Sequence, residues 1–145
     1  MNWKIEYSES TNSLLTFVSD FAELDDFMNS IDTHRWITFI DISIKEEAIH
    51  LQYRGLTYAN YLDNFDVEAG IFIPNGSIRI NLYVSHDCQG EILVKKKDFE
   101  EALLAYSERL LEIHQNNKDL PEKWAKEMKE GIEKLKNKID GYSAC

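Results

Sequence analysis

The dipeptide Asn75-Gly76 is the feature that most strongly limits how this chain can fold. It stands between two runs of β-branched residues, and Asn-Gly favours a two-residue type I′ hairpin turn, which needs positive φ at both central positions. Pro74 cannot donate a hydrogen bond within a sheet, so we expect it at a strand end beside the turn. We therefore predict a β-hairpin within residues 69–84 at the centre of an antiparallel sheet. Its second strand alternates with a period of two, which predicts one buried face formed by Ile78, Ile80, Leu82 and Val84.

Other apolar stretches predict further strands at residues 3–7, 14–18, 36–45, 49–54 and 92–94. Residues 13–31 also admit a helical interpretation. The Ile-rich segment 36–45 is assigned to a strand because Trp36, Ile40, Ile42 and Ile44 would share one face. We expect Gly55 to end the strand 49–54 and residues 86–90 to form a turn.

Three segments have the apolar spacing of helices. Residues 21–31 follow a carboxylate version of a capping box, Asp20 with Glu23. Near the end of the chain, Asp98 is a candidate N-cap of one helix, and Pro121 is suited to the first turn of the next, which Gly141 ends. The predicted buried faces are Phe99, Leu103, Tyr106, Leu110 and Ile113, then Trp124, Met128, Ile132, Leu135 and Ile139.

These elements together predict one α+β domain over residues 1–145. We expect a single antiparallel sheet of about six to seven strands, with one helix near the N-terminus and two C-terminal helices packed on it. A chain of 145 residues is long enough to bury a substantial core without disulfides or metals.

The formal charge of −10 is unevenly distributed along the chain. Residues 1–94 contain 15 Asp and Glu against 5 Lys and Arg, whereas residues 95–145 contain 11 of each. Such an acidic surface repels nucleic acid and anionic membranes, and it attracts a basic partner. Two cysteines, Cys88 and Cys145, are too few for a disulfide framework, and neither a signal peptide nor a membrane-spanning run is visible. We expect a cytoplasmic protein that binds neither nucleic acid nor membrane.

Residues 56–68 combine aromatic and acidic side chains without a clear period. Tyrosines supply rigid anchors with a polar tip, and carboxylates complement a basic surface. We predict a partner-binding surface there, with two weaker candidates at its rim on the first helix; each tyrosine could instead pack in the core. The candidates are Tyr58, Tyr61, Asp63, Asp66 and Glu68, with Asp25 and Asp26 at the rim.

No pattern in the sequence predicts a cofactor or a metal. His86, Asp87 and Cys88 are consecutive, whereas zinc ligands are usually spaced so that two side chains can converge. The glycines are scattered and form no phosphate-binding loop. An enzyme that used Asp63, Asp66, His86 and Cys88 is a less favoured hypothesis, and we predict a protein without catalytic activity.

The chain resembles the small immunity proteins of bacterial contact-dependent and other polymorphic toxin systems. Three features carry the resemblance: one acidic α+β domain of this size, the aromatic and acidic stretch 56–68, and a strand at 90–94 linked to a helix that starts Asp98-Phe99. It implies a protein that binds and neutralises a cognate basic toxin domain, commonly a nuclease. The alternative is a structural or adaptor domain that homodimerises through a sheet edge or the Trp124 helix.

Overall fold

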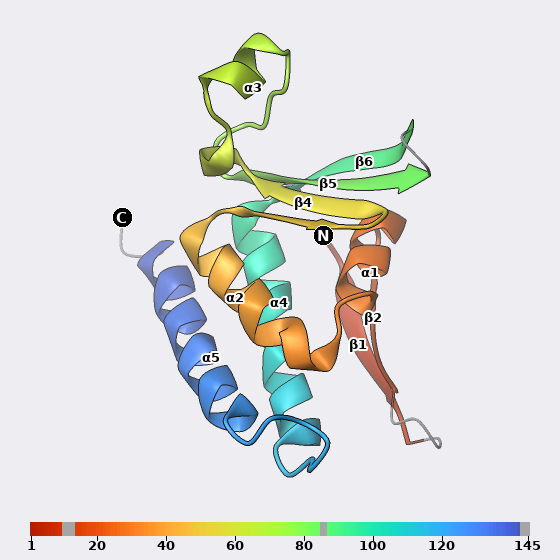
Figure 1. Cartoon of the computed structure of the whole chain (residues 1–145), viewed down its shortest axis with the longest axis vertical. Helices are drawn as coiled ribbons and strands as arrows, with labels where there is room; N and C mark the ends of the chain where they lie inside the picture. Colours follow the sequence, from red (N-terminus) through yellow and green to blue (C-terminus); the bar gives the residue numbers. More distant parts are fainter. Residues whose placement is uncertain (10–13, 85–86, 143–145) are drawn as a thin grey trace.

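Four antiparallel strands form the main sheet of the computed structural model, which describes residues 1–9, 14–84 and 87–142 (Figure 1). The strands lie in the order β3-β4-β5-β6. A separate two-stranded sheet pairs β1 with β2. The α+β class is confirmed, but the single sheet of six to seven strands is wrong. The bounds are β1 Trp3–Ser8, β2 Leu14–Ser19, β3 Ala48–Leu51, β4 Arg54–Tyr58, β5 Ser77–Val84 and β6 Asp87–Lys95.

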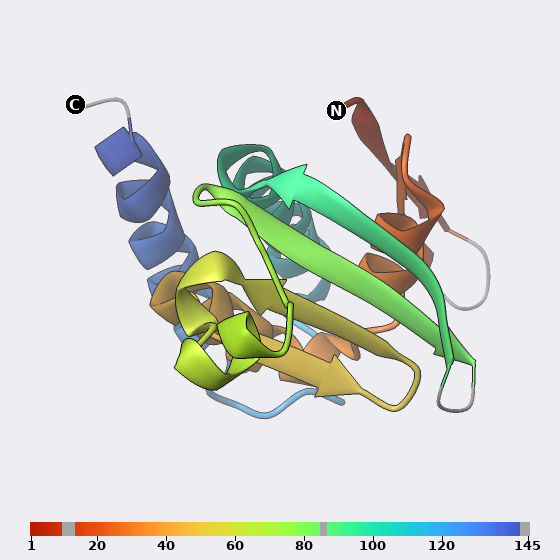
Figure 2. The same ribbon diagram turned by 90° about the horizontal axis from the view of Figure 1, so that it is seen from above.

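Four helices cover one face of the main sheet, and a short fifth helix, α3, stands on the opposite side (Figures 1 and 2). One continuous hydrophobic cluster joins both sheets and the four long helices. Its centre is aromatic, with the ring of Trp36 lying 5.3 Å from that of Phe39 and 4.6 Å from that of Tyr106. The helices are α1 Ala22–Asn29, α2 Trp36–Lys45, α3 Asn64–Glu68, α4 Lys96–His114 and α5 Trp124–Gly141, with 3-10 turns η1 Thr33–Arg35 and η2 Ala59–Tyr61.

The predicted strand at 36–45 is wrong, because this segment forms α2. Its buried residues are Trp36, Phe39, Ile40 and Ser43, and this spacing of 3, 1 and 3 is that of a helix face. Isoleucine favours strands, yet packing of this face outweighs a propensity difference that is only a few tenths of a kcal/mol per residue.

The hairpin centred on Asn75-Gly76 is also wrong. The Ser77 N–H donates to the Pro74 carbonyl at 3.0 Å, so a tight turn is present, but residues 71–74 form no strand. Gly76 has φ of 79°, whereas Asn75 does not have positive φ, which excludes a type I′ turn. β5 instead pairs with β4 and β6. Ile78 and Ile80 are buried as predicted and Leu82 is partly buried, while the side chain of Val84 lies outside the described part.

The strand bounds of the main sheet correct two further predictions, the turn at residues 86–90 and the strand end at Gly55. Residues 87–90 belong to β6, although they were assigned to a turn together with residue 86, which lies outside the described residues. The predicted strand at 49–54 is divided between β3 and β4, so Gly55 lies inside β4. Between β3 and β4 the chain reverses at Gln52 and Tyr53, which continue the strand-like alternation of polar and apolar side chains in the sequence.

The remaining elements follow the sequence pattern, except that the N-cap of α1 is Phe21 and no side chain caps the helix, so the predicted capping box of Asp20 and Glu23 is wrong. The β1–β2 hairpin pairs Trp3 with Ser19, and residues 22–29 form α1. The predicted faces of α4 and α5 are buried, apart from Ile113, which is only partly buried. Asp98 lies within the first turn of α4, not at its N-cap, and α5 begins three residues after Pro121.

Candidate interaction surface

Residues 59–76 leave the main sheet after β4 and return to it at β5; we call this segment the lobe. It stands on the face of the sheet opposite the four long helices (Figures 1 and 2). The lobe contains three carboxylates, Asp63, Asp66 and Glu68, and neither lysine nor arginine. Its net charge is therefore negative whatever its side-chain conformations.

Helix α3 is fixed at both of its ends. The Asp66 N–H donates to Asp63 Oδ1 at 2.9 Å, and the Asp63 N–H donates to Asp66 Oδ2 at 3.1 Å, which forms a reciprocal capping box. At the other end the Ile71 N–H donates to the Asp66 carbonyl and the Gly70 N–H to the Val67 carbonyl. This is a Schellman motif, with Gly70 at the left-handed position, φ of 83°. The lobe therefore has defined local structure.

The lobe exposes large apolar side chains. Six such side chains are exposed among the described residues, and three of them belong to the lobe: Tyr61 is 52% exposed, Val67 63% and Phe72 76%. Beside Phe72, the side chain of Ile73 is buried. Leaving apolar area in water is unfavourable, and apolar side chains that gather within a polar surface commonly mark an interaction site.

Four of the seven predicted site residues lie together on the lobe. Tyr61, Asp63 and Glu68 are exposed, and Asp66 is partly buried. One carboxylate oxygen of Asp63 and one of Asp66 accept the backbone hydrogen bonds that cap α3. Glu68 has its side chain at the surface, where it contributes charge.

The placement of Tyr58 on this surface is corrected, because Tyr58 is completely buried. Its ring lies 6.4 Å from that of Phe99, and Lys138 Nζ lies 5.2 Å from its ring centroid. Burial raises the pKa of Tyr58 well above its usual value, and the nearby Glu100 adds to this effect. Tyr58 is the last residue of β4 and occupies an inward position next to Leu56 and Ile78, so core packing determines its role.

Asp25 and Asp26 do not join the lobe. They lie on α1, which is on the other side of the main sheet (Figure 1). Asp26 forms an ion pair with Arg54, with Nε 2.6 Å from Oδ2. The predicted rim is therefore not continuous with the lobe.

Val67 and Phe72 are surface residues that the sequence pattern did not predict. Phe72 was assigned to a strand of the central sheet because it lies in the apolar run 71–73. The flanking residues argued against a strand at this position. Gly70 and Pro74 enclose a run of three apolar residues, which is too short for a strand buried on both faces.

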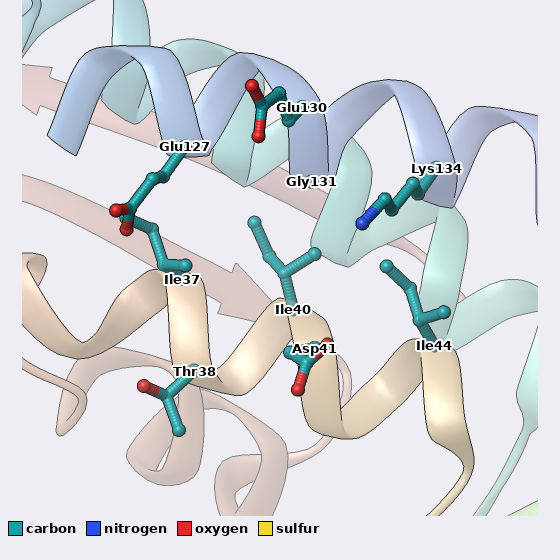
Figure 3. A pocket seen from close by; sticks show the side chains of 9 residues that line it. All are labelled: Ile37, Thr38, Ile40, Asp41, Ile44, Glu127, Glu130, Gly131 and Lys134. Carbon is teal, nitrogen blue, oxygen red and sulfur yellow. The ribbon is translucent and has the colours of Figure 1, made fainter. Parts of the chain in front are cut away.

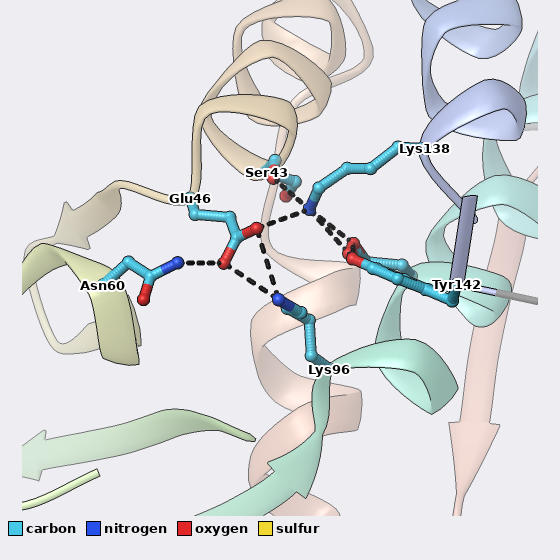
Figure 4. Close-up of polar contacts among 7 residues, drawn as sticks. Ser43, Glu46, Asn60, Lys96, Lys138 and Tyr142 are labelled. Atoms are coloured by element: carbon cyan, nitrogen blue, oxygen red, sulfur yellow. Dashed lines mark hydrogen bonds and ion pairs between the residues drawn. The ribbon is translucent and has the colours of Figure 1, made fainter. Parts of the chain in front are cut away.

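A cluster of four charged side chains, one buried and three partly buried, lies where the lobe meets the body (Figure 4). We call Glu46, Lys96, Glu100 and Lys138 the ionic cluster. Lys138 Nζ lies 2.6 Å from Glu100 Oε1 and 3.5 Å from Glu46 Oε2, and it donates to the Ser43 carbonyl at 3.0 Å.

Glu100 is completely buried, and burial raises its pKa. Hydrogen bonds from Lys138 and from the Tyr142 hydroxyl oppose that rise because they stabilise the carboxylate. The sequence did not indicate this cluster, since its members come from the end of α2, the start of α4 and the end of α5.

A groove of about 300 Å³ lies between α2 and α5 (Figure 3). Ile37, Ile40 and Ile44 form its apolar floor, and Gly131 allows the two helices to approach closely there. Three acidic side chains, Asp41, Glu127 and Glu130, and one basic side chain, Lys134, line its edges, and Asp41 pairs with the neighbouring Lys45 at 3.0 Å. The groove follows the seam of a packed helix pair, and it lacks the single sign of charge that the lobe has.

The other chemical candidates are not tested by the described residues, because the side chains of Asp87 and Cys88 lie outside what the structure describes. His86 lies outside them, and Asp87 and Cys88 belong to β6. Among the residues whose side chains the structure describes, no group of three or more His, Cys, Asp or Glu is placed to hold a metal ion. In the same residues, no helix combines the length and apolar character needed to cross a membrane.

Comparisons with protein-family models, with curated proteins and with solved structures found no match to this chain. The functional proposal therefore rests on the lobe and on the charge of the chain.

Proposed function

We propose that this protein is a non-catalytic, immunity-type inhibitor that binds a basic toxin domain, a nuclease, through the lobe. The observation that carries the proposal is the combination found on residues 59–76. The segment carries three exposed large apolar side chains and three carboxylates, and it contains no basic residue.

This combination suits the active cleft of a nuclease. Such a cleft must bind phosphate and is therefore rich in lysine and arginine. Carboxylates on the lobe would occupy the positions of substrate phosphates, and the net charge of −10 would accelerate encounter. Tyr61 and Phe72 have few rotatable bonds, so burying them in a partner sacrifices little side-chain entropy.

The local structure of the lobe favours tight binding. Because α3 is capped at both ends, the lobe loses less conformational freedom on binding than an open loop of the same length. A smaller entropic cost leaves more of the favourable contact free energy as binding affinity.

Inhibition of purified toxin nucleases tests this proposal. We would titrate the protein against a panel of basic nuclease domains from bacterial polymorphic toxins and measure cleavage of nucleic acid. We expect inhibition of one domain that is complete at an equimolar ratio. Phe72→Ala and Tyr61→Ala should each weaken inhibition by about 30-fold, the effect of losing about 2 kcal/mol at a hot spot.

Tyr53→Ala is the matched control, because Tyr53 is 46% exposed but lies in the turn between β3 and β4. Inhibition that all three variants weaken equally, or failure to inhibit any domain, would contradict the proposal. Light scattering on the protein alone addresses the alternative of a homodimerising structural domain. Of its two suggested interfaces, the Trp124 face is already used internally, since Trp124 is buried and its indole N–H donates to the Thr33 carbonyl at 3.0 Å.

A further inference from the structure

Glu46 has an unusual backbone conformation for its residue type. It follows α2 with φ of 55° and ψ of 47°, and it is the one non-glycine residue with positive φ in the described part of the chain. The Glu47 N–H donates to the Ile42 carbonyl and the Glu46 N–H to the Ser43 carbonyl, which is a Schellman motif. Glycine normally occupies this position, as Gly70 does after α3. A strained residue retained where glycine would fit indicates a role for its side chain.

The Glu46 carboxylate makes contacts that glycine could not make (Figure 4). It accepts a hydrogen bond from Asn60 Nδ2 at 2.9 Å and lies 3.1 Å from Lys96 Nζ. Asn60 is the second residue of the lobe. The carboxylate thus joins the beginning of the lobe to the body of the protein.

Lys96 holds the other end of the lobe. Its backbone N–H, at the start of α4, donates to the carbonyl of Gly76 at 2.7 Å. Gly76 is the last residue of the lobe, so the Glu46–Lys96 ion pair connects both of its ends. Both side chains are largely buried, which shields the pair from solvent and salt.

We propose that the Glu46–Lys96 pair, acting through Asn60 and Gly76, is a clamp that fixes the orientation of the lobe for its partner. Glu46 and Asn60 are positioning residues in this account. The inference rests on the proposed function of the lobe. It adds that affinity depends on residues outside the contact surface, because they hold the lobe in its binding orientation.

Asn60→Ala tests the clamp with little risk to the fold, since Asn60 is exposed. We would measure hydrogen exchange of the amides in residues 59–76 in the free protein, the global stability in urea, and the affinity for the nuclease domain identified by the inhibition panel. We expect faster exchange in the lobe, unchanged global stability, and an affinity lower by about fivefold, the effect of one modest hydrogen bond. Asn75→Ala is the matched control, because it makes the same change at an exposed position near the other end of the lobe.

A second pair of variants separates positioning from a general structural effect. Asn60→Asp places a carboxylate against Glu46 and should loosen the lobe further than Asn60→Ala does. Adding Glu46→Gln restores a donor and an acceptor across the contact with residue 60 but removes the charge that pairs with Lys96. Exchange in the lobe should therefore fall below that of Asn60→Asp and stay above that of the original protein.

The outcomes distinguish this inference from the proposed function. Lobe exchange that is unchanged in Asn60→Ala overturns the clamp, whatever the partner does. Faster exchange without loss of affinity also overturns it, because orientation would then be irrelevant to binding. If the original protein binds and Phe72→Ala does not weaken binding, the proposed function of the lobe fails, while the exchange data still report on the clamp.

Discussion

At the scale of single residues, the two Schellman motifs give a direct internal comparison. Gly70 and Glu46 have the same left-handed backbone and the same pattern of hydrogen bonds. A side chain in this conformation costs about 1 kcal/mol relative to glycine. At Glu46 this cost is offset by the ion pair with Lys96 and the hydrogen bond from Asn60.

We predict that Glu46→Gly is more stable than Glu46→Ala by about 1 kcal/mol, the reverse of the order within a helix. Both variants lose the carboxylate, so their difference isolates backbone strain. Urea unfolding of the two variants measures it. An alanine variant as stable as the glycine variant would show that the backbone relaxes at this position.

Tyr106 gives the protein a pH dependence in the alkaline range. Its hydroxyl donates to the Leu15 carbonyl at 3.2 Å, and burial raises its pKa from 10.0 to about 12. Above pH 10 the unfolded chain releases this proton while the folded protein retains it. The contribution of Tyr106 to stability is therefore fully present below pH 10 and is lost as the pH rises toward 12.

Between these two pH values we predict that Tyr106→Phe reduces the loss of stability by about 1.4 kcal/mol per pH unit relative to the original protein. The measurement is urea unfolding of both proteins at several pH values from 9 to 11.5. Lysine titration affects both proteins equally and cancels in the difference. Parallel stability curves would contradict the assigned pKa.

At the scale of elements, the packing of α2 on α5 depends on Gly131. A Cβ at this position would lie 3.2 Å from Cγ2 of Ile40, which is itself buried and has little room to move. Alanine favours a helix over glycine by about 1 kcal/mol, but overpacking costs about 1–3 kcal/mol. The steric term is the larger of the two.

Gly131→Ala should therefore lower the free energy of unfolding by about 1 kcal/mol. Gly141→Ala is the matched control on the same helix, because nothing lies within 4 Å of the added methyl group, and it should be neutral or stabilising. Thermal unfolding of both variants compares them. Stabilisation by Gly131→Ala would mean that α2 and α5 can separate at this crossing without loss.

The same elements show how far the sequence predicts the fold. α4 and α5 were predictable because their long apolar periods are local properties of the chain. α2 was not, since ten residues rich in isoleucine fit a strand as well as a helix until a partner such as α5 is known. The lobe was predicted in part, since Tyr61 and the three carboxylates do lie at the surface. Tyr58 was predicted at the surface but is buried, and Phe72 was predicted in a strand of the sheet but is exposed. The ionic cluster could not be predicted, because its charges converge only in the tertiary structure.

At the scale of the whole molecule, the charge and the lobe act together. The acidic excess belongs to residues 1–94, which include the lobe, whereas residues 95–145 carry no net charge. The two C-terminal helices therefore contribute side chains to the core without adding to the net negative charge. In the proposed function, that excess would attract a basic partner to the molecule, and the apolar side chains of the lobe would then hold it in place.

The most direct test of this account is hydrogen exchange of the complex with the inhibited nuclease domain, compared with the free protein. The account predicts slower exchange within residues 59–76, with the strongest protection around α3 and Phe72, and unchanged exchange across the solvent face of α5. Protection confined to the α2–α5 groove or to the β3 edge, with an unprotected lobe, would contradict it.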